Sequence, residues 1–345
     1  MIRYLRARPR EVLAGLAVML LALALGVRFA FIGGSDNGVY GGPPPGGPYR
    51  AFSSSSYWNT PLPPDAPVAP GSERFLRYLA REDGANFLTL SGVGPRGLWG
   101  NPIYWARSRD PSYHIQNTCS DPAPPEFRSV RIPLGAAPDP TSDASMTVYD
   151  LQKGIVYGLW RTRFDPMTHQ WAACGGAAFY LSSNGLDGSL PRSDQPRNQG
   201  HRGVPPSTFA VRYDEITAGS IEHVLKVAVP RTACYNVFPL VGHECGTHDP
   251  AAPPEGMRLR LKPSIDLQSM HLSPAQLTIA RALQRYGAVI GDQSGRSAEL
   301  KLENTVVEGR GDLWGGVLSA TSLSMFTFND YEVIQLGYSP PSSVR

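Results

Sequence analysis

Residues 242–249 have the sequence GHECGTHD, which places two histidines, two carboxylates and one cysteine within eight residues. A zinc protease carries its two histidines four residues apart on a helix, with a glutamate between them as general base. Here His243 and His248 are five residues apart, and the glycines and prolines around them exclude a helix. The sequence therefore predicts no metal site and no cofactor here, and it assigns Cys245 to a disulfide.

The chain has four cysteines, Cys119, Cys174, Cys234 and Cys245. An even number of cysteines in an oxidising compartment is typical of disulfides, and four cysteines allow three pairings. The pairing of Cys234 with Cys245 closes the shortest loop and leaves Cys119 for Cys174. We expect this pairing.

Three other side chains are candidates for acid–base chemistry. His223 falls on the apolar face of the alternating stretch 221–229, where a histidine is either a hydrogen-bonded core residue or a general acid or base. Asp292 ends another apolar stretch and Asp143 precedes a third, and each is either a turn residue or a carboxylate at the rim of a site. We expect His223 to pair with Asp292. Hydrolysis of a glycosidic bond needs two carboxyl groups, for which Asp143 and Asp292 are the candidates.

Many aromatic residues lie next to glycine, asparagine or proline rather than on a regular core pattern, as in the stretch 99–105. Rings that stack on the apolar faces of sugars are typical of glycan contact, although large β-proteins also bury such rings. We expect Trp99, Trp105 and the cation Arg258 to bind a polysaccharide or cell-wall glycan. Burial of these rings in a core is the alternative.

These residues must be positioned by short strands, because 36 glycines and 33 prolines divide the chain into short segments. Alternation is clearest at 256–262, which predicts a half-buried strand with its arginines facing solvent. The stretch 221–229 predicts a second strand, and 146–150 with 155–160 predict a hairpin. Further strands are predicted at 127–132, 176–181, 235–238, 288–291, 298–302 and 331–336.

Two helices are predicted. Residues 273–276 form a capping box with proline at the first helical position, and a glycine at 287 ends this helix. The second helix runs from Ser72 to the break at 83–84. We expect an all-β-dominated fold, one antiparallel β-sandwich of jelly-roll type over residues 51–340 with two peripheral helices.

The N-terminus has four arginines before an uncharged apolar run at 12–27, which is typical of a signal peptide or a short signal anchor. We expect residues 1–32 to be an uncleaved single-pass anchor in the cell membrane, with the main domain extracytoplasmic. Cleavage and secretion are the alternative. Residues 33–50 are rich in glycine and proline and predict a linker.

The net charge of +3 comes from the N-terminal segment. Residues 1–50 hold six of the 32 basic residues and two of the 29 acidic ones, which leaves 26 basic against 27 acidic residues. A nucleic-acid-binding domain carries a basic field. The sequence therefore predicts no nucleic-acid partner.

The stretch 221–292 combines a strand I-x-H-x-L, a segment P-x-G-x-R-x-x-L-K, a helix ending in R-A-L-x-x-Y-G and a strand ending in aspartate. In this pattern it resembles a group of secreted bacterial proteins of unassigned function. The matching residues are Ile221, His223, Leu225, Gly256, Arg258, Leu261, Lys262, Arg281, Ala282, Leu283, Tyr286, Gly287 and Asp292, and Val224 replaces an alanine of that group. The resemblance implies an extracytoplasmic, β-rich domain and no particular reaction.

Two hypotheses for function follow. The first is a cell-surface enzyme that cleaves a polysaccharide, either a glycoside hydrolase using Asp143 and Asp292 or a lyase with His223 as base. The second is a non-enzymatic envelope protein that binds a glycan or a partner. Convergence of Asp143, His223 and Asp292 in one aromatic groove would favour the enzyme, and their separation would favour the binding protein.

Overall fold

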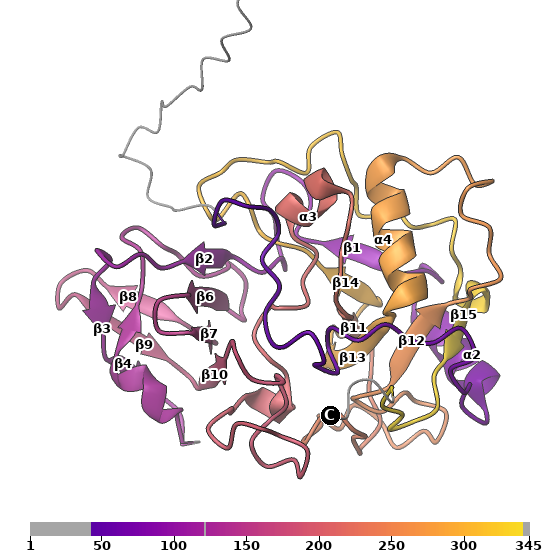
Figure 1. Cartoon of the computed structure of the whole chain (residues 1–345), viewed down its shortest axis with the longest axis horizontal. Helices are drawn as coiled ribbons and strands as arrows, with labels where there is room; N and C mark the ends of the chain where they lie inside the picture. The colour runs from indigo at the N-terminus through magenta and orange to yellow at the C-terminus, as the bar shows by residue number, and fades with distance from the viewer. Residues whose placement is uncertain (1–42, 121, 341–345) are drawn as a thin grey trace, which may run out of the picture. The chain divides into compact units, whose positions relative to one another are not determined.

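A computed structural model describes residues 43–120 and 122–340 of the chain (Figure 1). The predicted membrane anchor and most of the predicted linker lie outside the described residues. Within the part of the chain that is described, no helix combines the length and the apolar character needed to cross a membrane.

The larger sheet has six strands in the order β1-β14-β11-β13-β12-β15. Their bounds are β1 Thr89–Ser91, β14 Glu299–Lys301, β11 Leu225–Val229, β13 Ala288–Gln293, β12 Arg258–Leu261 and β15 Tyr331–Val333. Two neighbouring pairs, β1 with β14 and β11 with β13, are parallel. The sheet is therefore mixed, and not antiparallel throughout as expected. The reason is that β12 comes between β11 and β13 in the chain and runs antiparallel to β13, so the chain reverses direction twice between β11 and β13.

A second sheet has four strands in the order β10-β7-β6-β2. The bounds are β10 Gly176–Tyr180, β7 Ile155–Leu159, β6 Met146–Asp150 and β2 Ile103–Trp105. The predicted hairpin is confirmed, because β6 and β7 pair antiparallel with Asp150 opposite Ile155. Two small sheets pair β3 Ser112–Tyr113 with β5 Val130–Arg131, and β4 Ile115–Asn117 with β9 Gln170–Ala173 and β8 Arg163–Asp165.

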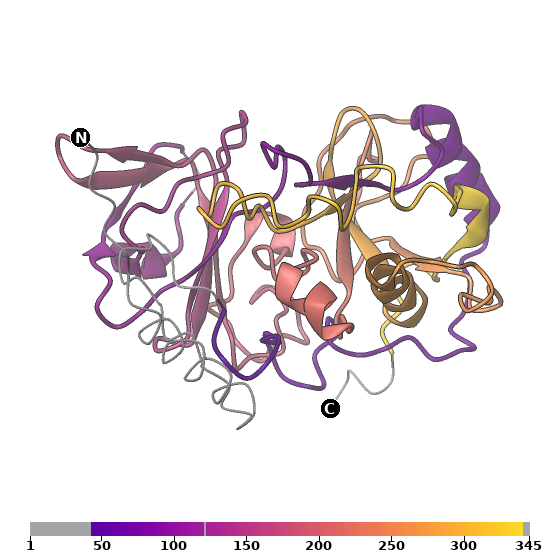
Figure 2. The same ribbon diagram turned by 90° about the horizontal axis from the view of Figure 1, so that it is seen from above.

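The described residues contain three α-helices, α2 Ser72–Glu82, α3 Tyr213–Ala218 and α4 Pro274–Arg285, of which α2 and α4 were predicted. The predicted capping box of α4 is present, with Ser273 accepting a hydrogen bond from the backbone of Gln276. Apolar side chains of α2 and α4 share one core cluster with alternate residues of β11, β12 and β13. Figure 2 shows both helices beside this sheet.

A second core cluster joins the two larger sheets. It contains Val224 and Val289 from the six-stranded side, and Tyr149, Val156 and Phe179 from the four-stranded sheet. The opposite face of the four-stranded sheet packs on the small sheets through a third cluster. Most of the chain is thus β-rich and built in layers, and the two larger sheets meet along one apolar core.

Three strand predictions need correction. The strand expected at 221–229 begins only at Leu225, because the Val224 amide pairs with the carbonyl of Trp58 rather than with a neighbouring strand. Strand β12 is not half-buried. Both Arg258 and Arg260 are 3% exposed, since their guanidinium groups donate to carbonyls of the N-terminal segment at Thr60 and at 63–64. The segment expected at 235–238 contains no strand, only an isolated bridge at Asn236.

Candidate functional site

His223 lies inside the protein, 3% exposed, as predicted from its position on the apolar face. Its Nε2 lies 2.8 Å from Glu215 Oε1 and its Nδ1 lies 2.8 Å from the Val224 carbonyl oxygen. Both ring nitrogens therefore face a hydrogen-bond acceptor when Glu215 is ionised. The partner of His223 is therefore Glu215, and the expected pairing with Asp292 is wrong.

Glu215 belongs to α3, the short helix that the sequence analysis missed. Its Oε1 also lies 2.9 Å from Arg212 Nη2, and its Oε2 accepts from the Arg212 backbone amide at 3.0 Å. Burial would raise the pKa of Glu215, but the charges of Arg212 and His223 outweigh this and hold it below 4.5. Arg212, Glu215 and His223 form a closed buried network, and a substrate has no access to it.

Asp292 lies near the end of β13, as predicted, and is held by two cations. Its Oδ2 accepts from Lys226 Nζ at 2.9 Å, and its Oδ1 accepts from Arg202 Nη2 at 3.1 Å. Burial would raise the pKa of this carboxyl, but Lys226 and Arg202 hold it well below 3.8. Asp292 is therefore ionised at neutral pH and remains partly open to solvent, with 30% of its side chain exposed.

The Arg202 guanidinium gathers two further carboxylates. Glu255 is fully buried, and its Oε1 accepts from Arg202 Nη1 at 2.7 Å. The side chain of Glu244 is 36% exposed, and its Oε2 lies 3.3 Å from the same nitrogen. Burial raises the pKa of Glu255 despite the charge of Arg202, whereas the pKa of Asp292 is lowered. Two carboxyl groups on one guanidinium therefore have pKa values shifted in opposite directions.

An exposed tryptophan adjoins this cluster. Trp160 follows β7 and is 38% exposed, and its ring lies nearly parallel to the His201 imidazole, with centroids 6.3 Å apart and an interplanar angle of 14°. His201 directly precedes Arg202, and partial burial together with the Arg202 charge lowers the pKa of His201. The Arg161 guanidinium lies 4.4 Å from the centre of the Trp160 ring. The His201 imidazole is thus neutral at pH 7. It lies beside the Trp160 ring, which the Arg161 guanidinium covers on one face.

Asp143 is connected to Trp160 through the next residue in the chain, Arg161. It is exposed in the loop before β6, and its backbone carbonyl accepts from the Arg161 amide at 2.8 Å. We use the name "surface row" for Asp143, Trp160, His201 and Asp292, together with the arginines at 161 and 202 between them. The structure places two of the three predicted acid–base residues along this row and buries the third, His223, elsewhere.

The three predicted binding residues have different environments. Trp99 is 42% exposed in its loop, which agrees with its prediction as a loop aromatic. Trp105 is 5% exposed and stacks on Tyr149 with centroids 4.4 Å apart, so it is a core residue. Arg258 is also buried, with its Nε donating to the Tyr286 carbonyl at 2.6 Å. The sequence did not single out Trp160 as exposed, because strand periodicity alone does not distinguish an exposed ring from a core ring.

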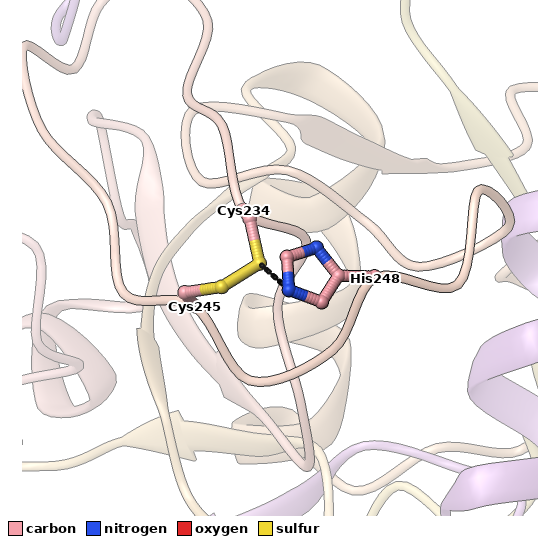
Figure 3. Close-up of side chains that lie close together, drawn as sticks. All are labelled: Cys234, Cys245 and His248. Atoms are coloured by element: carbon pink, nitrogen blue, oxygen red, sulfur yellow. Dashed lines mark hydrogen bonds between the residues drawn. A yellow bond between two sulfur atoms is a disulfide. The ribbon is translucent and has the colours of Figure 1, made fainter.

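Both predicted disulfides are present, Cys119–Cys174 and Cys234–Cys245. They indicate an extracytoplasmic location. The second disulfide closes the loop that carries Glu244, and it therefore helps to place this carboxylate beside Arg202. Figure 3 shows His248 next to the bridge, with its Nε2 3.9 Å from Cys234 Sγ.

Cys234, Cys245 and His248 offer three ligand atoms within 4.8 Å of one another, the spacing of a metal site. Metal-binding cysteines act as thiolates, and both sulfurs are bonded to each other here. In the oxidised protein this trio is a disulfide with a neighbouring imidazole.

Comparison of the chain with protein-family models, with curated proteins and with solved structures found no match. The function must therefore be argued from the chemistry of the site.

Proposed function

We propose that this chain is an extracytoplasmic glycan-binding protein of the cell envelope, held at the membrane by its N-terminal segment, and that the surface row is its binding site. The observation that carries the proposal is the exposed Trp160 ring beside the His201 imidazole. Asp292 lies on the neighbouring Arg202, and Asp143 is bonded through its backbone to Arg161. A sugar presents an apolar face to a ring and hydroxyl groups to carboxylates, and Asp143 and Asp292 are both acceptors for such hydroxyls.

Binding is favoured over cleavage because the three expected acid–base residues do not converge. His223 is enclosed with Glu215, and Asp292 is neutralised by Lys226 and Arg202. A carboxylate between two cations is a poor base, but it still accepts a hydrogen bond from a hydroxyl. The row suits a neutral sugar, because Asp292 and Arg202 are already ion-paired within the protein.

The test is a titration of the purified protein with neutral polysaccharides from bacterial envelopes, followed by calorimetry. We expect Trp160→Ala to weaken binding by roughly tenfold, which corresponds to about 1.4 kcal/mol. Phe164→Ala is the matched control, because the Phe164 ring is as exposed as that of Trp160, lies outside the surface row and should leave binding unchanged. Equal binding by the Trp160→Ala variant and the parent protein would contradict the proposed site.

Cleavage of the glycan is the second candidate, favoured by the opposite pKa shifts of Asp292 and Glu255. Such a pair is typical of acid–base catalysis, in which one carboxyl group is protonated and the other ionised. Glu255 would have to become accessible, since it is fully buried. Release of new reducing ends that stops in both Glu255→Gln and Asp292→Asn would support this candidate, and their absence with the parent protein would exclude it for the polysaccharides tested.

A further inference from the structure

A pocket of about 520 Å³ lies between the C-terminal half of α4, the end of α3 and the N-terminal segment. The pocket and the surface row share no residue. The pocket lining includes Leu62, Ile221, Arg260, Arg281, Ala282 and Arg285. Its size is within the range of small-molecule sites in proteins.

All the charged residues that line this pocket are positive. Three of the lining residues are arginines and none is acidic. Arg260 is compensated inside the protein, because it pairs with Glu332 and donates to the Pro63 carbonyl at 2.8 Å. Arg281 and Arg285 are exposed, and among the described residues neither has an ion-pair partner. Two positive charges at the pocket are therefore not neutralised by the protein.

The other polar groups of the lining are mostly engaged in the fold. Gln284 Nε2 donates to the carbonyls of Lys262 and Ile265, and Thr278 Oγ1 donates to the Pro274 carbonyl. These bonds fix the walls. The Arg285 guanidinium lies over the Tyr286 ring, 5.3 Å from its centroid, a contact that leaves its positive charge without a carboxylate, as for Arg281. A ligand of this pocket must therefore supply acceptors and negative charge.

The spacing of the two arginines adds to this argument. Residues 281 and 285 are one turn apart on α4, where like charges repel and destabilise a helix slightly. Arginines near a helix C-terminus also complement the helix dipole, so their charge alone does not indicate a ligand. The pocket beside the two arginines is the feature that indicates a ligand, because an anion bound there would contact both guanidinium groups through charge-assisted hydrogen bonds.

We infer that this pocket binds the carboxylate or phosphate group of a sugar-sized organic anion. Leu62, Ile221 and Ala282 provide apolar surface for the body of the ligand, and Arg281 and Arg285 hold its charged group. The inference does not rest on the proposed function of the surface row. The two sites are distinguishable, because one contains Trp160 and takes neutral sugars whereas the other contains arginines and requires a charge.

The experiment is a calorimetric titration of the full chain with glucuronate and with glucose 6-phosphate, using glucose as the neutral counterpart and inorganic phosphate as the bare anion. We expect at least one of the two organic anions to bind, and to bind more tightly than either counterpart. Added salt should weaken this binding, because the ionic contacts are at the surface. Arg281→Ala and Arg285→Ala should each weaken it at least tenfold.

Two control variants test whether the effect is specific to the pocket. Arg296→Ala removes another exposed arginine that has no ion-pair partner among the described residues and does not line the pocket, so binding should be unchanged. Trp160→Ala should also leave binding of the anion intact. An affinity for glucose equal to that for both organic anions, or unchanged binding by both pocket variants, would overturn the inference. Binding of inorganic phosphate alone would overturn the assignment of the ligand class.

Discussion

The most informative residues in this protein are its buried charges, because each requires a partner. The network of Arg212, Glu215 and His223 is closed, with each side chain paired within 3 Å. Taking one member from a buried ion pair typically costs about 3–5 kcal/mol, because the charge that remains is uncompensated. This network therefore fixes α3 beside the start of β11 more firmly than a six-residue helix could do alone.

Glu215→Gln should lower the free energy of unfolding at neutral pH by about 3 kcal/mol. The folded protein holds the pKa of Glu215 below its ordinary value of 4.5, so the carboxylate stabilises the fold above that pH. This contribution is lost as the pH falls below 4.5 and through the lower folded pKa. The variant should therefore lose less stability on acidification than the parent protein.

Denaturant unfolding at a series of pH values measures both effects. Glu222→Gln is the matched control, because Glu222 is exposed and its ion pair with Arg50 is at the surface, where such pairs contribute little. A Glu215→Gln variant as stable as the Glu222→Gln variant would show that the buried network does not stabilise the fold.

The sequence predicted the position of His223 and Asp292 but not their partners. Position follows from local alternation, which places His223 inward and Asp292 near a strand end. Partners depend on side chains from other elements, such as Arg202, which comes from a segment with no regular pattern and has a positive φ of 58°. A left-handed arginine in a loop gives no periodic signal, so the charge cluster around Asp292 could not be predicted.

At the scale of elements, helix ends were predicted best. The capping box of α4 is a local chemical pattern, and the structure contains both of its hydrogen bonds, Ser273 N to Gln276 Oε1 at 2.8 Å and Gln276 N to Ser273 Oγ at 3.3 Å. Strand exposure was predicted less well. The alternation in β12 suggests solvent-facing arginines, yet a segment about 200 residues earlier in the chain covers Arg258 and Arg260.

Ser273→Ala should destabilise the protein by about 1 kcal/mol, because it removes the side-chain acceptor for an amide in the first turn of α4. Chemical denaturation measures the change. Ser264→Ala is the control, since Ser264 is an exposed serine in the loop before this helix. Equal stability of the two variants would mean that Gln276 and Pro274 are sufficient to start the helix.

At the scale of the whole molecule, residues 49–64 connect the layers through their contacts. Trp58 is buried and stacks on Phe209 with centroids 4.3 Å apart, and the Leu62 amide donates to the Arg285 carbonyl at 2.8 Å. The segment also reaches back to Tyr49, whose carbonyl accepts from Arg212 Nη2 at 2.7 Å. The sequence analysis placed the domain boundary at residue 51 because residues 33–50 look like a linker, but the last two of these residues pack on the domain.

Three shortened chains test this boundary by their denaturation midpoints. A chain beginning at residue 43 keeps every contact of the described segment and should unfold at the same denaturant concentration as the full chain. A chain beginning at residue 51 loses Tyr49, whose ring lies edge-on to Trp105 at 5.8 Å, and its bond to Arg212. It should be destabilised by roughly 2–3 kcal/mol, from one lost aromatic side chain and one lost hydrogen bond to a charged group.

A chain beginning at residue 67 loses Trp58 and uncovers Arg258 and Arg260. It should fail to fold, because these two buried cations would lose their carbonyl partners at Thr60 and at 63–64. The decisive comparison is between starts at 43 and 51. Equal stability of these two would show that Tyr49 contributes nothing and that the boundary read from the sequence is correct. If the chain beginning at residue 43 aggregates and adding residues 1–42 restores its folding, the domain does not fold independently of residues 1–42.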